Sequence, residues 1–162
     1  MTENVAERLE IVKRQEELAV FTSFGEEDAF RLGSLLHRLA HEQKAPVVID
    51  IRTPDRVLFH AAMPGSAPDN DAWIIRKSNI TLRFHQASLR VGEALASRNR
   101  HVGPELGLDP LYFAAHGGSF PIRLSNAGVV AAVTVSGLPS IEDHRLVIAA
   151  LSRFLDVTLP AI

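Results

Sequence analysis

Residues 114–137 read AAHGGSFPIRLSNAGVVAAVTVSG, and this segment carries the clearest strand and turn pattern for predicting the fold. Apolar and polar side chains alternate through residues 120–125, which is typical of a strand with one buried face. Residues 126–128, Asn-Ala-Gly, have the composition of a tight turn. Residues 129–136 are almost all apolar, so we expect a strand covered on both faces. The stretch therefore predicts a β-hairpin.

A second hairpin is predicted upstream, where residues 47–52 and 57–61 alternate on either side of the turn sequence Thr-Pro-Asp-Arg. The β-branched and aromatic segment 18–24, LAVFTSF, predicts a fifth strand. Apolar spacing and capping residues predict helices over residues 2–17, 26–45, 71–86, 88–99 and 140–155. Ser140 is the expected N-cap of the last helix, with Asp143 three residues later. This order predicts an α+β domain with a five-stranded antiparallel sheet and helices packed on it.

Length and composition narrow the function classes. The 162 residues suit one domain, 1–162, and the net charge of −2 gives no electrostatic case for binding nucleic acid or a membrane surface. The chain has no cysteine, which excludes disulfides and zinc–thiolate sites. The amphipathic N-terminus does not resemble a signal peptide, so we expect a cytoplasmic protein. The motifs of dinucleotide binding, P-loop hydrolysis, α/β-hydrolases and zincins are all absent from the sequence.

Lys77 is the first candidate binding residue. It falls at helical spacing in an apolar stripe with Trp73, Ile80 and Phe84. A buried ammonium is unfavourable unless it is paired, so the position predicts a partner or a ligand anion. The alternative is that the stem packs while the charged end reaches water.

The sequence His116-Gly117-Gly118-Ser119 is the second candidate. Two adjacent glycines allow unusual backbone angles and a close approach to a ligand, and their N–H groups form a candidate anion nest. Pro121 follows within the strand and lacks a ladder donor, which predicts an edge strand or one open to a neighbour. The alternative is a plain turn before an edge strand.

Three further histidines, His144, His37 and His41, differ in their predicted surroundings. His144 is in line with the apolar residues of the last helix, so it faces inward, and a neutral imidazole there can ligate iron, accept a hydrogen bond or serve structure alone. His37 and His41 share a helix face, but no third ligand is near in sequence, so we predict a solvated surface and no metal site. The other basic residues, Arg76 among them, also suit a solvated surface.

A family resemblance rests on three C-terminal motifs, HGGSFPI (116–122), VSGLP (135–139) and EDH (142–144). Trp73, Lys77 and FHQAS (84–88) support it upstream. The chain resembles the haem-degrading-domain family, which includes glycolate-operon accessory proteins, PduO C-terminal domains and secreted haem-binding proteins, and it is most similar to the cytoplasmic UPF branch. The resemblance implies a profilin-like fold, assembly into rings and a haem or tetrapyrrole site. The chain departs from the family pattern in carrying Ser119 and Phe120 between Gly118 and Pro121, and His144 where an acidic residue is common.

The leading hypothesis is an oligomeric small-molecule-binding protein whose ligand is haem or a related anionic cofactor. His116 or His144 would ligate or hydrogen-bond the cofactor, Lys77 and Arg123 would pair with its carboxylates, and Gly117 and Gly118 would line the site. The alternative is a non-catalytic oligomeric module in which the same features make subunit contacts. A hydrolase or lyase using Asp143 and His144 ranks last because no nucleophile accompanies them. Whether the chain is an enzyme is left open by the sequence.

Overall fold

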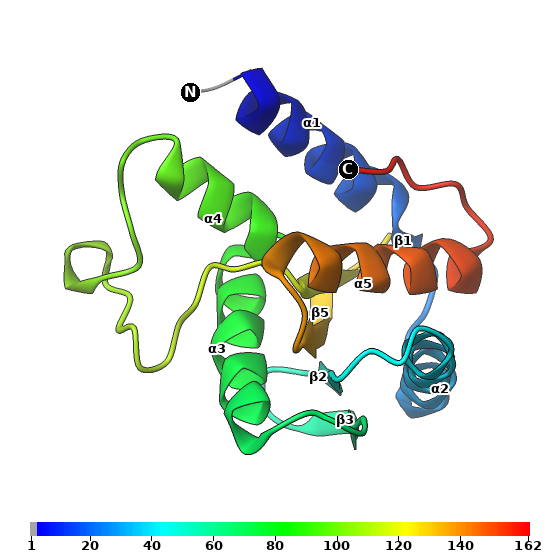
Figure 1. Ribbon diagram of the computed structural model, residues 1–162. Helices are drawn as coiled ribbons and strands as arrows, with labels where there is room; N and C mark the ends of the chain where they lie inside the picture. The colour runs from blue at the N-terminus through cyan, green and yellow to red at the C-terminus, as the bar shows by residue number, and fades with distance from the viewer. Residues whose placement is uncertain (1–2) are drawn as a thin grey trace.

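The computed structural model describes residues 3–162 and contains a five-stranded sheet with helices on both faces (Figure 1). Its elements are α1 (Glu3–Leu18), β1 (Val20–Phe21), α2 (Glu26–Glu42), β2 (Val48–Arg52), β3 (Val57–Ala62), α3 (Pro68–Phe84), α4 (Ser88–Ala96), the short 3₁₀ helix η1 (Pro104–Leu106), β4 (Ser119–Leu124), β5 (Gly128–Ser136) and α5 (Ser140–Leu155). The predicted α+β class, the five strands and both hairpins are confirmed. The predicted first helix began at Thr2, which lies outside the described residues.

The sheet has the strand order β1-β4-β5-β2-β3. The pairs β2–β3, β2–β5 and β4–β5 are antiparallel, as expected, but β1 runs parallel to β4. No hairpin turn joins β1 to β4, so nothing local in the sequence set their relative direction. β1 is also shorter than predicted at both ends: α1 continues to Leu18, and the strand ends at Phe21 rather than Phe24.

Pro121 lies where β4 has a strand partner on one side. It pairs with Ala132 of β5, whereas β1 reaches β4 only at Arg123 and Leu124. The missing N–H of Pro121 therefore interrupts no ladder to β1. The open side that the proline predicted is present, although β4 is not a full edge strand.

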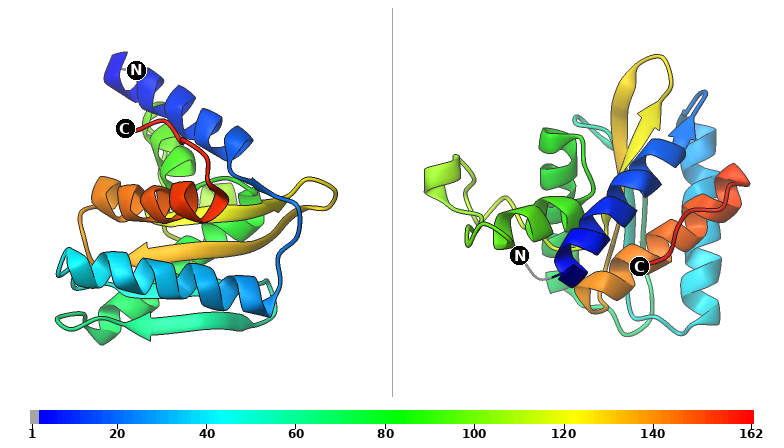
Figure 2. Two further views of the ribbon diagram at one scale, coloured as in Figure 1. Left: turned by 90° about the vertical axis from the view of Figure 1, so that its right-hand side faces the viewer. Right: turned by 90° about the horizontal axis from the view of Figure 1, so that it is seen from above.

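The two faces of the sheet differ in chemistry. One face packs against α2 and α5 (Figure 2), and its core is apolar, with Ile49, Phe120 and Val133 all fully buried. The other face lies against α3 and is largely polar. There the hydroxyl of Thr134 donates to Ser119 Oγ at 2.9 Å and is also hydrogen-bonded to Ser78 at 2.9 Å. Ser78, on the inner face of α3, therefore meets a polar partner on the sheet, whereas the buried hydroxyl of Thr81 one turn later has none within residues 3–162.

The start of α3 is tied to the edge strand through His60. Its ring lies 2.7 Å from Asp50 on β2 through Nδ1 and 2.7 Å from Asp71 on α3 through Nε2. Asp50 is fully buried and also accepts two hydrogen bonds from Arg52, at 2.6 and 2.7 Å. Burial acts to lower the pKa of His60, but the hydrogen bonds to the two carboxylates outweigh it, and the pKa is raised above its ordinary value.

This raised pKa gives a prediction for His60→Gln. A histidine whose pKa is higher in the folded than in the unfolded protein stabilises the fold below pH ~6.5, and this contribution is lost as the pH rises through the folded value. We expect urea denaturation to show a larger loss of stability for the variant at pH 5.5 than at pH 8.5. The difference should be below about 1 kcal/mol because the ring is 38% exposed. An equal loss at both pH values would contradict the assignment.

Within residues 3–162, no helix combines the length and the apolar character needed to cross a bilayer.

Candidate functional site

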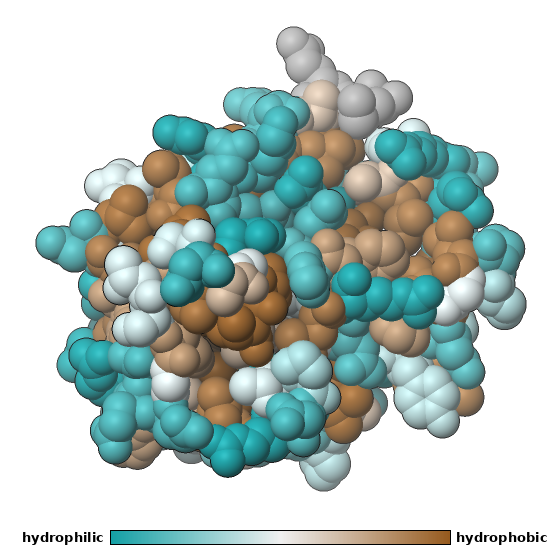
Figure 3. All heavy atoms as spheres, turned by 180° about the vertical axis from the view of Figure 1, so that it is seen from behind, coloured by the Kyte–Doolittle hydropathy of each residue, from teal (hydrophilic) through white to brown (hydrophobic). Residues whose placement is uncertain are grey.

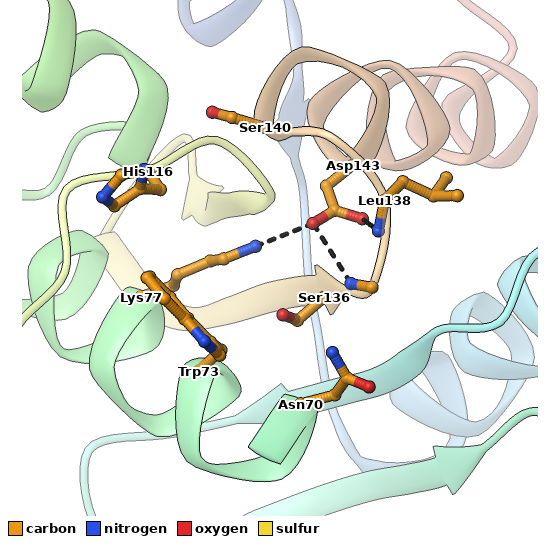
Figure 4. A pocket seen from close by; sticks show the side chains of 9 residues that line it. Asn70, Trp73, Lys77, His116, Ser136, Leu138, Ser140 and Asp143 are labelled. Carbon is orange, nitrogen blue, oxygen red and sulfur yellow. Dashed lines mark hydrogen bonds and ion pairs between the residues drawn. The ribbon is translucent and has the colours of Figure 1, made fainter. Parts of the chain in front are cut away.

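A cleft of about 210 Å³ opens between α3, the end of β5 and the first turn of α5 (Figure 4). It is lined by Asn70, Trp73, Lys77, His116, Ser136, Gly137, Leu138, Ser140 and Asp143. The cleft thus brings together residues of α3 with the loops before β4 and α5, which are far apart in the sequence.

Lys77 forms the inner wall of the cleft and is 3% exposed. Its Nζ donates to the carbonyl oxygens of Gly117 at 2.8 Å and Val135 at 3.0 Å, and to Asp143 Oδ2 at 2.9 Å. The partner expected from the sequence is therefore within the chain, and the alternative of a charged end reaching water is wrong. Because an ammonium has three protons, these contacts leave none for an external carboxylate.

Asp143 joins this lysine to the start of α5. Besides Lys77, its carboxylate accepts the backbone N–H groups of Leu138 at 2.9 Å and Gly137 at 3.3 Å. Burial raises the pKa of Asp143 and lowers that of Lys77, while the attraction between the two charges opposes both shifts. With every hydrogen-bonding position of the ammonium filled, the pair stays charged and fixes the loop before α5.

The expected capping of α5 differs from the structure. Pro139 is the N-cap, and the Ser140 hydroxyl instead accepts the Gly117 N–H at 2.7 Å. Asp143 reaches back to the preceding loop, as described above. These contacts dock the Gly-Gly segment against the helix start.

The Gly117-Gly118 segment allows close packing rather than forming an anion nest. The N–H of Gly117 is taken by Ser140, and the next strand residue, Ser119, donates its N–H to Ser88 Oγ at 3.0 Å. Gly118 has φ +126°, and a Cβ there would lie 2.3 Å from the Val135 oxygen and 2.8 Å from Lys77 Nζ. Only glycine fits this close approach to the buried lysine.

His116 stands at the mouth of the cleft and is exposed. Its ring meets Trp73 edge-on, with centroids 5.2 Å apart and planes at 89°, and the guanidinium of Arg76 covers Trp73 at 4.5 Å. The imidazole makes no hydrogen bond to the chain within residues 3–162. Partial desolvation of the ring by its neighbours, followed by the positive charges of Lys77 and Arg76, lowers the pKa of His116, which favours the neutral ring at pH 7. A neutral, accessible imidazole can ligate a metal centre or accept a proton.

A second cavity, of about 350 Å³, lies on the other side of His116. Its walls are largely apolar and its rim is cationic. It is lined by Arg76, Gly92, Leu95, Ala96, Arg100, His101, Val102, Pro110, Phe113, Ala114, Ala115 and His116. His116 therefore separates a polar cleft from an apolar groove.

Four predicted site residues line neither cavity. Gly117 and Gly118 pack against α5 and β5, as described above, and Arg123 and His144 lie elsewhere. Arg123 donates to the carbonyl oxygen of His85 at 2.8 Å. His144 is 1% exposed, packs against Phe120 and lies 2.8 Å from Gln15 Oε1 through Nε2. Because Gln15 Nε2 donates to the carbonyl of Pro160, its Oε1 is an acceptor, and His144 must carry its proton on Nε2. Burial lowers the pKa of His144 to about 3.

Several residues of the site were missed or misread from the sequence. Arg76, expected on a solvated face, covers Trp73 and donates to the Pro110 carbonyl at 2.9 Å. Asp143 was read as a cap, although its charge is opposite to that of Lys77. Asn70 and Ser136 carried no signal beyond their positions at a helix start and a strand end. Across residues 3–162, no three histidine or acidic side chains cluster in a way that would hold a metal ion.

Similarity to known proteins shows the family to which this fold belongs. The model for HbpS-like haem degrading proteins matches residues 24–152, and the chain belongs to this family. It is 53% identical over 144 residues to the UPF0303 protein SCO2848 of Streptomyces coelicolor, covering 89% of this chain and 91% of that protein.

Solved structures share the fold. The crystal structure of the Ybr137w protein superposes with a TM-score of 0.84 at 30% identity, covering 96% of each chain. The crystal structure of a PduOC:heme complex superposes with a TM-score of 0.69 at 15% identity, covering 85% of this chain and 98% of that one. The second likeness concerns the fold alone.

Proposed function

We propose that this protein binds haem, or a related anionic tetrapyrrole, with His116 as the group that faces the metal. The observation that carries the proposal is the state of the His116 ring, which is exposed, kept neutral by its surroundings and without a hydrogen-bond partner in residues 3–162. Neutral imidazole is the commonest protein ligand of haem iron. The family match and the heme complex formed by a protein of the same fold support this proposal.

The groove beside His116 fits the rest of a tetrapyrrole. Leu95, Val102 and Phe113 offer apolar contacts to a flat macrocycle, and Arg76 and Arg100 lie at its rim, where acidic substituents would reach them. His144 does not suit the same role, because its ring is buried and bound to Gln15. Haem would supply the redox and ligand-binding chemistry of its iron; the chain's own residues would orient it and shield one face.

The test is a haem titration followed by the Soret band. Wild type is expected to give a saturable shift, and His116→Ala to weaken binding at least about tenfold, or 1.4 kcal/mol. His41→Ala, an exposed histidine on α2, is the matched control and should bind as wild type does. His101→Ala measures whether the other histidine of the groove contributes. An absent shift, or one unchanged in His116→Ala, would overturn the proposal.

We also propose that the chain self-associates through the edge strand β3. β3 has a neighbouring strand on one side, so its other side presents unpaired backbone groups. Val57 on β3 is 50% exposed, and Phe30 on α2 is 62% exposed and meets Phe59 edge-on at 6.4 Å. Apolar side chains also reach the surface in several places on the face shown in Figure 3. A second copy of the chain would cover this edge.

Light scattering after size exclusion tests this second proposal. Wild type should have a mass that is a multiple of 17.7 kDa, and Val57→Lys should shift it toward the monomer by placing a charge at the edge. Leu111→Lys, at a residue 77% exposed on the loop between η1 and β4, should leave the mass unchanged. A wild-type monomer at micromolar concentration would refute self-association.

A further inference from the structure

The polar cleft on the inner side of His116 holds several hydrogen-bonding groups without partners. Within residues 3–162, the Ser136 hydroxyl, the Trp73 indole N–H and the Asn70 Nδ2 group make no hydrogen bond to the chain, and all three residues line the cleft. Ser136 is only 3% exposed. Asn70 and Trp73 are half-buried. A polar side chain as deep as Ser136 nearly always has a partner, which here is a ligand or water.

The orientation of Asn70 adds to this pattern. Its Oδ1 accepts the backbone N–H of Ala67 at 2.9 Å, which identifies the other amide atom as the nitrogen donor. Figure 4 shows that nitrogen turned toward Ser136, at the end of β5. The unpartnered groups of the cleft are therefore mainly donors, and the ligand they fit is rich in acceptor oxygens.

The electrostatics of the cleft favour one negative charge. The charges of Lys77 and Asp143 cancel, and Arg76 adds a positive charge beside His116. The N-terminus of the 16-residue helix α5 borders the cleft at Ser140, so the positive end of its dipole is close. The carboxylate of Glu142, also in this first turn, is engaged by Arg145.

We propose that this cleft is a carboxylate-binding site in which Ser136 Oγ, Asn70 Nδ2 and Trp73 Nε1 donate to the carboxylate oxygens. Its 210 Å³ suits a small acid or one acidic substituent, since a cavity of about 150 Å³ holds a benzene molecule. The carboxylate belongs either to a free small acid or to a propionate of haem bound at His116. The inference rests on the proposed function only for the second source.

Trp73 makes the first source directly measurable, because it is the only tryptophan of the sequence. Its indole N–H gives one resolved peak in a ¹H–¹⁵N spectrum of the full chain. Sodium propionate is expected to move this peak saturably, whereas propionamide, which has nearly the same shape without the charge, should not. Sodium chloride at equal ionic strength controls for screening.

Two variants test the donors. Asn70→Asp keeps the oxygen that accepts the Ala67 N–H but replaces the donor with a negative charge, so it should abolish propionate binding. Ser136→Ala should weaken binding about tenfold or more, consistent with one lost hydrogen bond to a charged group. Ser125→Ala, at an exposed residue between β4 and β5, is the matched control and should bind as wild type does.

The second source is tested with haem and its dimethyl ester, whose propionates carry no charge. If a propionate occupies the cleft, wild type binds haem more tightly than the ester, and Asn70→Asp and Ser136→Ala lose that preference. Saturable binding of propionate, or tighter binding of haem than of its dimethyl ester, supports the carboxylate site. Negative results in both arms overturn it. Propionate binding without any haem binding would refute the proposed function and leave the carboxylate site standing.

Discussion

Lys77→Met is expected to destabilise the protein by about 3–5 kcal/mol, because it leaves the Asp143 carboxylate buried without its cation. Lys77 and Asp143 are 3% and 1% exposed, so water in the cleft solvates the unpaired carboxylate far less well than bulk water does. The same change removes the donor to the carbonyl oxygens of Gly117 and Val135. Urea denaturation of the variant and wild type measures the loss.

A second variant separates charge pairing from packing. Lys77→Met combined with Asp143→Leu removes both charges, and we expect it to be more stable than the sum of the single changes predicts, by about 1–3 kcal/mol. Full recovery is not expected, since the N–H groups of Gly137 and Leu138 lose their acceptor. Strict additivity of the two changes would show that the ion pair does not couple α3 to α5.

Gly118→Ala is expected to destabilise the protein by about 2–4 kcal/mol, from a strained positive φ and from overpacking. The added methyl group would sit 2.3 Å from the backbone oxygen of Val135, which belongs to a central strand and cannot move aside. It would also press on Lys77 Nζ, so we expect it to disturb the site as well as the fold. Thermal unfolding measures the first effect, and the chemical shift of the Trp73 indole reports the second.

Gly25→Ala is the matched control for this change. Gly25 has φ −139°, and a Cβ there would meet no atom of residues 3–162 within 4 Å. Its expected loss is below about 1 kcal/mol, the scale of replacing glycine by alanine at a helix N-cap. If both variants lost the same stability, the close approach of Gly118 to β5 would not be the cause.

The strands and helices were predictable where the pattern was local. Alternating side chains and turn residues identified both hairpins, and the almost entirely apolar segment before Ser136 identified a strand buried from Ala131 onward. The direction of β1 was not predictable, because its neighbour β4 lies a hundred residues away and no turn joins them. The polarity of the face beneath α3 was visible only once β2, β4 and β5 were placed side by side.

The site was predictable only where its signals were local, because most of its contacts join residues far apart in the sequence. The apolar stripe around Lys77 showed that its ammonium needed a partner, and the partner exists. That this partner is Asp143, 66 residues away, depends on how α5 docks on the sheet. His144 was correctly expected to face inward, but the side chain that meets it, Gln15, comes from α1, 129 residues earlier. Arg123 had no local signal to show that it would contact the His85 carbonyl.

A crystal structure of the haem complex would show which residue of this protein holds the iron. The proposed function predicts iron within bonding distance of a ring nitrogen of His116, with the macrocycle against Leu95 and Phe113. Iron bound to another histidine, or haem located away from both cavities beside His116, would contradict it.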